Sequence, residues 1–171
     1  MHRTIQLLRL FFSFCFFRNQ PEDIPESDAV ALFKRNVYLY LVMWLIVLST
    51  LEDLVAAVLQ TGIGLVMTLS YIWLLLFASR RLQLFLRSAT AVMGVQTIFV
   101  AASFPWVLSL HVSEAEKILY PFYIIILLGL WLLAVIAYLL KKSLSTTKMS
   151  SSLMAVGYFS AVLGSAFALF A

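Results

Sequence analysis

The sequence predicts an all-α membrane protein, a polytopic helix bundle of about five transmembrane helices plus an N-terminal interfacial amphipathic helix. Of the 171 residues, 63% are hydrophobic and only 12% are charged, and the mean hydropathy is +1.00, whereas a soluble domain carries about 25% charged residues. The apolar residues also form runs near the ~20 residues that cross a bilayer core. We expect residues 1–28 to form an N-terminal helix and loop, and residues 29–171 the transmembrane domain.

The N-terminal apolar segment Ile5–Phe17 is too short to cross a membrane and is interrupted by Arg9. We expect it to lie at the interface, with its arginines reaching the head groups and its phenylalanines in the acyl boundary. The acidic loop Asn19–Asp28 follows, and its two prolines favour an extended or turned connection. Ser27 or Asp28 is the predicted N-cap of the next helix.

Five later runs have the length and composition of transmembrane helices. The second is expected to start after a turn in which Ser49 and Glu52 have capping-box spacing. The third is expected to end at Pro105, which has no N–H to donate. Lys141–Ser152 is the longest hydrophilic connection that we predict. The predicted spans are Ala29–Leu51, Leu54–Ala78, Ser88–Trp106, Tyr120–Leu140 and Leu153–Ala171.

The third span is the predicted centre of the bundle, because it is the most polar of the runs and has no charged side chain after Arg87. Polar and small residues let helices approach closely and bond one another inside a membrane. Such residues recur in other spans, and the last span carries four small ones on one helical face. The candidates for helix packing or partner binding are Gln60, Gly64, Thr90, Gly94, Gln96, Thr97, Gly157, Ala161, Gly164 and Ala168.

The basic residues predict the orientation. Of the 12 Lys and Arg residues, all except Lys117 fall on one side of the predicted spans, so the positive-inside rule places the N-terminus in the cytoplasm and the C-terminus outside. Some of these residues form what we call the basic collar, which either enforces topology, attracts anionic lipid or docks an acidic partner. The basic collar consists of Arg80, Arg81, Arg87, Lys141 and Lys142.

No catalytic constellation, cofactor motif or metal site is predicted. The spans hold no carboxylate or histidine of the kind that marks an ion-coupled transporter, and His111 with Glu114 and Glu116 is typical of a solvated loop. Cys15 is the single cysteine, so the chain has neither a redox pair nor a thiolate metal site. The net charge of +4 is too small and scattered to indicate nucleic-acid binding.

Three sequence features together resemble a known family. They are the Pro-Glu-Asp-Ile-Pro motif at Pro21–Pro25, a basic link leading into a Thr-Ala-x-x-Gly-x-Gln stretch at Thr90–Gln96, and Trp131-x-x-Ala-Val135 in the fourth span. In this order they resemble small bacterial inner-membrane proteins related to the Yip family. The resemblance implies a five-span fold, a bacterial inner membrane and a non-enzymatic role. In such a membrane, the C-terminus that the positive-inside rule places outside is periplasmic. Those relatives often have a histidine where this chain has Tyr138, and the resemblance transfers no active site.

The function expected is that of a non-enzymatic accessory, assembly or regulatory subunit that binds the lipid bilayer and another membrane protein or itself. The packing faces, the short soluble part and the uncharged spans favour this role. The alternative is a permease for a small neutral or lipidic solute that works as a homo-oligomer, with Gln60, Gln96 and nearby hydroxyls lining a path. A membrane-embedded enzyme ranks last, because no constellation of catalytic residues is present.

Overall fold

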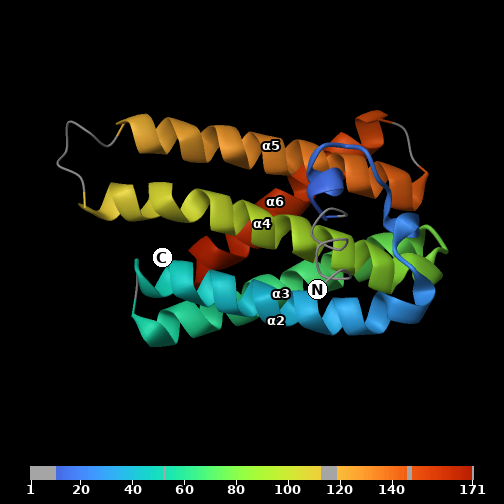
Figure 1. The fold of residues 1–171 in the computed structure, drawn as a ribbon, viewed down its shortest axis with the longest axis horizontal. Helices are drawn as coiled ribbons and strands as arrows, with labels where there is room; N and C mark the ends of the chain where they lie inside the picture. The colour runs from blue at the N-terminus through green and yellow to red at the C-terminus, as the bar shows by residue number, and fades with distance from the viewer. Residues whose placement is uncertain (1–10, 52, 113–118, 146–147, 171) are drawn as a thin grey trace.

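A computed structural model describes residues 11–51, 53–112, 119–145 and 148–170. These residues form helices and short connections, with no strand among them, so the predicted all-α bundle is confirmed. The long helices run alongside one another and reverse direction at each connection (Figure 1). They are α2 (Glu26–Ser49), α3 (Leu54–Ala78), α4 (Phe85–Val112), α5 (Leu119–Leu144) and α6 (Lys148–Phe170). Two 3₁₀ turns also occur: η1 (Pro21–Asp23) precedes α2, and η2 (Leu82–Leu84) lies between α3 and α4.

Within the described residues, four helices are long and apolar enough to cross a membrane, and the chain is therefore a multi-pass membrane protein. The described apolar stretch of α6, Met149–Val162, is shorter, and a fifth crossing stays a prediction. The four membrane-crossing stretches are Asp28–Ser49, Leu54–Ala78, Leu82–Leu110 and Leu119–Leu144.

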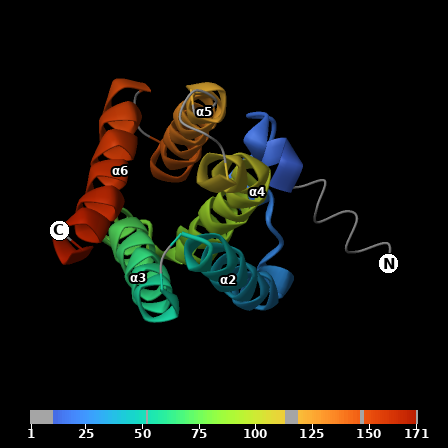
Figure 2. The ribbon, with the colours of Figure 1, turned by 90° about the vertical axis from the view of Figure 1, so that its left-hand side faces the viewer.

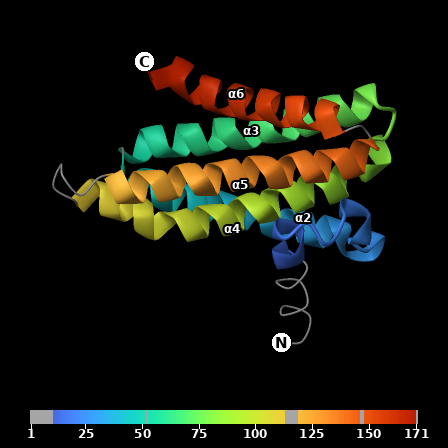
Figure 3. The same ribbon diagram turned by 90° about the horizontal axis from the view of Figure 1, so that it is seen from above.

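Helix α4 is the centre of the bundle. It packs against both α2 and α5, while α6 leans on α5 and α3 (Figure 2). In the apolar stretch of α4, 44% of the residues are buried, against 22% to 28% in the other three stretches. Figure 3 shows α6 and α3 on one side of α4 and the described N-terminal residues on the other. The third predicted span is thus the most deeply buried of the four.

The prediction that the third span ends at Pro105 is wrong, because α4 continues through it to Val112. A proline inside a helix removes one backbone hydrogen bond. Transmembrane helices tolerate this loss, since nearby hydroxyls can bond the freed backbone groups. The carbonyl that loses its donor is that of Ala101, one turn before Pro105, whereas the hydroxyl of Ser109 donates to the carbonyl oxygen of Pro105 itself over 2.8 Å.

The predicted long connection between the last two helices is also wrong. Helix α5 extends to Leu144 and α6 already starts at Lys148, so most of the hydrophilic segment is helical. The basic residues Lys141 and Lys142 occupy the last turn of α5, where positive charge is favourable next to the carbonyl end of the helix dipole. Hydrophilic sequence at a membrane surface can therefore extend a helix instead of ending it.

The predicted caps differ from those in the structure. Helix α2 starts at Glu26, with Pro25 as its N-cap residue, so it begins before either predicted cap. Helix α3 is capped by Asp53, whose carboxylate accepts a hydrogen bond from the backbone N–H of Ala56 over 2.7 Å. Ser49 instead donates to the carbonyl of Ile46 within its own helix, and Glu52 lies outside the described residues.

The N-terminal segment docks onto the bundle. Phe11–Cys15 is helical, and Phe11, Phe14 and Cys15 are buried in the same core as α4 and α5. The phenylalanines Phe12, Phe16 and Phe17 are exposed. The expectation that all these rings lie in the acyl boundary is therefore wrong, because one face of the segment packs against protein. The predicted helix residues before Phe11 lie outside the described residues.

Candidate functional site

Polar side chains from four helices meet in the middle of the bundle, and we call them the polar cluster. Tyr158 of α6 is its hub. The amide nitrogen Nε2 of Gln96 on α4 donates to the Tyr158 hydroxyl oxygen, and Oγ1 of Thr68 on α3 lies 2.8 Å from the same oxygen. The phenol of Tyr40 on α2 interacts with the Thr68 hydroxyl and with the phenol of Tyr158. All four side chains are buried.

The polar cluster lies near the middle of each contributing helix, where water is excluded. Hydrogen bonds between membrane helices contribute about 0.6 kcal/mol on average and up to roughly 2 kcal/mol. They also select one arrangement of the helices, because a slipped helix would leave these polar atoms unpaired. These hydrogen bonds therefore hold the four helices together. One acceptor has no partner among the described residues, the buried carbonyl oxygen Oε1 of Gln96.

Two glycines make room for tyrosine hydroxyls. A Cβ atom at Gly64 would lie 3.2 Å from the hydroxyl oxygen of Tyr40, and one at Gly157 would lie 3.0 Å from that of Tyr71. Tyr71 in turn donates to the carbonyl oxygen of Met154 over 2.7 Å, which ties α3 to α6 a second time. The predicted small residues thus pack between helices of this chain.

Gly94 accommodates the N-terminal segment. A Cβ atom there would lie 2.4 Å from two ring carbons of Phe11 and 3.1 Å from the amide nitrogen of Asn36. Real Cβ atoms essentially never lie as close to a neighbour as 2.4 Å, and the 3.1 Å distance to Asn36 is also tighter than most real Cβ contacts. Asn36 itself is buried and donates to the carbonyl oxygen of Thr90 over 3.0 Å. Only a glycine at this position lets the Phe11 ring and α2 both reach α4.

The other predicted residues take local roles. The hydroxyls of Thr90 and Thr97 donate to carbonyl oxygens one turn earlier in α4, over 2.6 Å and 2.9 Å. Gln60 is half-buried two turns before the polar cluster, and Ala161 is half-buried on α6. Gly164 and Ala168 belong to the end of α6, where side-chain surroundings lie outside the described part. The polar cluster accordingly contains Gln96 but not the other predicted polar residues.

Sequence reasoning missed the tyrosines of the polar cluster. Tyrosine in a membrane protein usually marks the interface, where its hydroxyl meets water. Tyr40 and Tyr158 instead lie far from the ends of their helices, and their position within the spans is the signal that could have identified them. Thr68 had a comparable signal as a hydroxyl within an apolar run.

The basic collar gathers at one end of the bundle. Helices α3 and α5 end there and α2, α4 and α6 begin there, at the right of Figure 1. Arg81 Nη1 donates to the hydroxyl of Ser145 over 2.7 Å, and the hydroxyls of Ser88 and Ser143 bond over 2.8 Å. The ammonium of Lys142 lies 5.8 Å from the centre of a tyrosine ring on α5. These contacts fasten the link between α3 and α4 to the end of α5.

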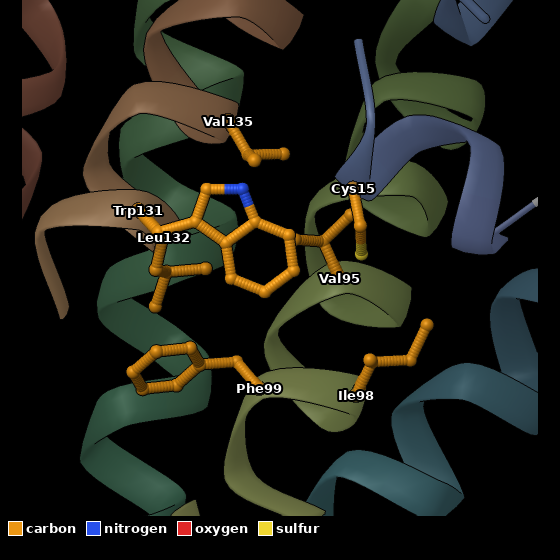
Figure 4. A pocket seen from close by; sticks show the side chains of 7 residues that line it. All are labelled: Cys15, Val95, Ile98, Phe99, Trp131, Leu132 and Val135. Carbon is orange, nitrogen blue, oxygen red and sulfur yellow. The ribbon is translucent and has the colours of Figure 1, made fainter. Parts of the chain in front are cut away.

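A small apolar cavity of about 10 Å³ lies where the N-terminal segment meets α4 and α5. In Figure 4, the ring of Trp131 reaches across it toward Val95 and Cys15. The volume is at the lower limit for a single water, and such apolar cavities stay dry. Burial raises the pKa of the Cys15 thiol to about 11, so the thiol is neutral and unreactive here. Its lining residues are Cys15, Val95, Ile98, Phe99, Trp131, Leu132 and Val135.

No group of three or more histidine, cysteine or acidic residues that could hold a metal ion occurs within the described residues. The side chains of the predicted loop trio, His111, Glu114 and Glu116, lie outside the described part of the chain.

Comparisons with known proteins add no relative. No family model matches the chain, and no curated protein or solved structure does. The fold and the arrangement of its buried polar groups are therefore the basis for assigning a function.

Proposed function

We propose that this protein is a non-enzymatic accessory subunit of a membrane protein complex in the bacterial inner membrane, with its N-terminus in the cytoplasm and its C-terminus in the periplasm. The Yip-like order of motifs and the collection of basic residues at one end support this topology. The observation that carries the proposal is an outer face on α3 that is suited to a close helix contact.

The outer face of α3 consists of exposed apolar residues with small ones between them. Gly62 has nothing within 4 Å of the position of its missing Cβ. Ser70 is exposed, and its hydroxyl has no hydrogen bond within the described residues. Gly62, Val66 and Ser70 are four residues apart and lie on one face, so a helix of another protein can approach closely. Val66 is itself exposed, and the other large exposed residues of this face are Val55, Leu59, Trp73 and Phe77.

This outer face differs from the inner packing faces. Gly64, Gly94 and Gly157 are each filled by a side chain of this chain, whereas Gly62 is open. Helix α3 also lies at the edge of the bundle, with α6 and α2 as its flanking neighbours (Figure 2). A hydroxyl and a glycine that face lipid gain a hydrogen bond and tight packing when a second helix covers them. We expect a membrane helix of the partner there.

The permease alternative has less support. Gln96, which would line a path for a solute, bonds Tyr158 instead. Thr90 and Thr97 bond carbonyls of their own helix. A substrate-dependent flux in proteoliposomes that Gln96→Leu abolishes would favour the permease over the accessory subunit.

The test is affinity purification from native membranes in mild detergent, with a tag on the C-terminus and mass spectrometry of the captured proteins. The wild type should yield a stoichiometric membrane partner, before and after cross-linking. Gly62→Leu should lose that partner because the added side chain holds the two helices apart. Gly129→Leu on α5 is the matched control, since Gly129 also has nothing within 4 Å of its missing Cβ.

Two outcomes would contradict the proposal. If the wild type is recovered alone, as a monomer or homo-oligomer, the accessory role is contradicted. If the partner stays bound to Gly62→Leu as well as to Gly129→Leu, the outer face of α3 is not the surface that binds the partner.

A further inference from the structure

We propose that the basic end of the bundle contains a pocket for the phosphate of an anionic phospholipid, which we call the headgroup pocket. It is a hollow of about 250 Å³ where the N-terminal segment, α5 and α6 come together. It is separate from the polar cluster and from the outer face of α3, and it does not depend on the accessory role. The lining residues are Phe17, Ala137, Tyr138, Lys141, Ser151 and Ser152.

The headgroup pocket lies at the depth of lipid head groups. Helix α5 crosses the membrane and ends at Leu144, so Tyr138 and Lys141 occupy its last two turns, nearly one turn apart on one face. The first turns of α6 contribute Ser151 and Ser152. The N-terminal segment passes over the same end of α5 in Figure 1. Three separate segments of the chain therefore build one interfacial hollow.

The lining favours an anion. Lys141 forms no ion pair or hydrogen bond, and the hydroxyl of Tyr138 has no hydrogen bond, within the part of the chain that the structure describes. The ammonium of Lys142 lies 5.8 Å from the centre of the Tyr138 ring and adds a second positive charge nearby. An ammonium offers three donors and a phenol one. A phosphate oxygen is the acceptor that suits both, because hydrogen bonds between opposite charges are the strong ones.

The size and the apolar walls favour a lipid over free phosphate. The volume of about 250 Å³ is several times the ~30 Å³ of one water, so a phosphate with its glycerol fits. The ring of Phe17 stands against that of Tyr138, with centres 5.4 Å apart. Trp131 lies further from the end of α5, and the exposed ring of Phe16 from the N-terminal segment has its centre 6.0 Å from that of Trp131, so the apolar wall continues there. An acyl chain can follow that wall, whereas inorganic phosphate gains nothing from it.

The experiment measures the thermal unfolding of the purified full chain in a neutral detergent. Phosphatidylglycerol is titrated into it, with phosphatidylcholine and glycerol 3-phosphate as the other arms. Phosphatidylglycerol should raise the midpoint in a saturable way, whereas the other two should not. Lys141→Gln should weaken this lipid response roughly tenfold, the loss expected for one charge-assisted contact. Tyr138→Phe, which removes only a hydroxyl, should weaken it severalfold.

Arg80→Gln is the matched control, because Arg80 is an exposed basic-collar residue that does not line the headgroup pocket. It should leave the lipid response unchanged. If Arg80→Gln and Lys141→Gln weaken the response equally, the attraction comes from the whole basic collar and the headgroup pocket is refuted. If Tyr138→Phe and Lys141→Gln both unfold normally and keep the full response, it is also refuted. Equal stabilisation by glycerol 3-phosphate would overturn the lipid as the occupant.

Discussion

The substitution Gly94→Val should release the N-terminal segment from the bundle. The segment is docked through Phe11, whose ring lies against the α-carbon of Gly94. A Cβ atom at this position would lie 2.4 Å from two carbons of the Phe11 ring, so the ring must move away. Because Cys15 is buried on the same short helix, its exposure to a thiol reagent reports whether the segment is docked.

The expected free-energy cost of Gly94→Val for docking the N-terminal segment follows from packing and helix propensity. Overpacking a close-packed core costs about 1–3 kcal/mol, and the upper part of this range applies because two ring carbons are met at 2.4 Å. Replacing a helical glycine returns only a few tenths of a kcal/mol when the new residue is valine. The net cost of about 2 kcal/mol corresponds to a ~30-fold larger undocked population. The labelling rate of Cys15 should rise by about that factor.

The assay is the rate at which membrane-permeant N-ethylmaleimide labels Cys15, the single cysteine, in native membranes. Gly62→Val is the matched control, because nothing lies within 4 Å of its missing Cβ, and it should leave the rate unchanged. Phe11→Ala should raise the rate on its own, and Gly94→Val should then add little. An unchanged rate in Gly94→Val, or an equal rise in Gly62→Val, would refute the proposed contact between Gly94 and Phe11.

Three further predictions concern the hydrogen bonds and the thiol. Tyr158→Phe removes the hub of the polar cluster and should lower the free energy of unfolding in detergent by about 1–3 kcal/mol. Tyr38→Phe, at an exposed tyrosine, should change it little, and an equal loss in both would contradict the hub. Ser143→Ala breaks the 2.8 Å bond to Ser88 and should cost about 1 kcal/mol or less in the same measurement; a loss of several kcal/mol would contradict this. Burial raises the pKa of the Cys15 thiol from 9.0 to about 11. Docking is therefore fully stabilised below pH 9 and weakens as the pH rises toward 11, and protease protection of the segment should follow this course but stay flat in Cys15→Ser.

Much of the fold could be predicted because a transmembrane helix is a local structure. Each helix satisfies its own backbone hydrogen bonds, so apolar length alone identifies it. The predicted second span, Leu54–Ala78, coincides with α3. The predictions are wrong at Pro105 and at Lys141–Ser152, because proline and hydrophilic residues interrupt helices in water more readily than they do in a membrane protein. Helix α4 continues through Pro105, and α5 and α6 both extend into the hydrophilic segment.

The candidate site could be predicted only in part. Gln96 stood out as an amide within an apolar run, but nothing in its neighbours along the chain indicates Tyr158, which lies 62 positions later. Likewise, Gly94 was recognisable as a small residue on a packing face, whereas the Phe11 ring that fills the space comes from a segment expected to face lipid.

The sequence by itself determined that this chain is helical, membrane-spanning and basic at one end. Hydropathy decides segment by segment what enters the lipid, and the charges next to each segment decide which side of the membrane they stay on. Only the tertiary structure decided which polar groups meet, which glycines are filled and which one faces lipid. Those outcomes depend on how neighbouring helices are rotated and how far they are shifted along one another. Packing across the whole bundle sets both, and no single segment encodes them.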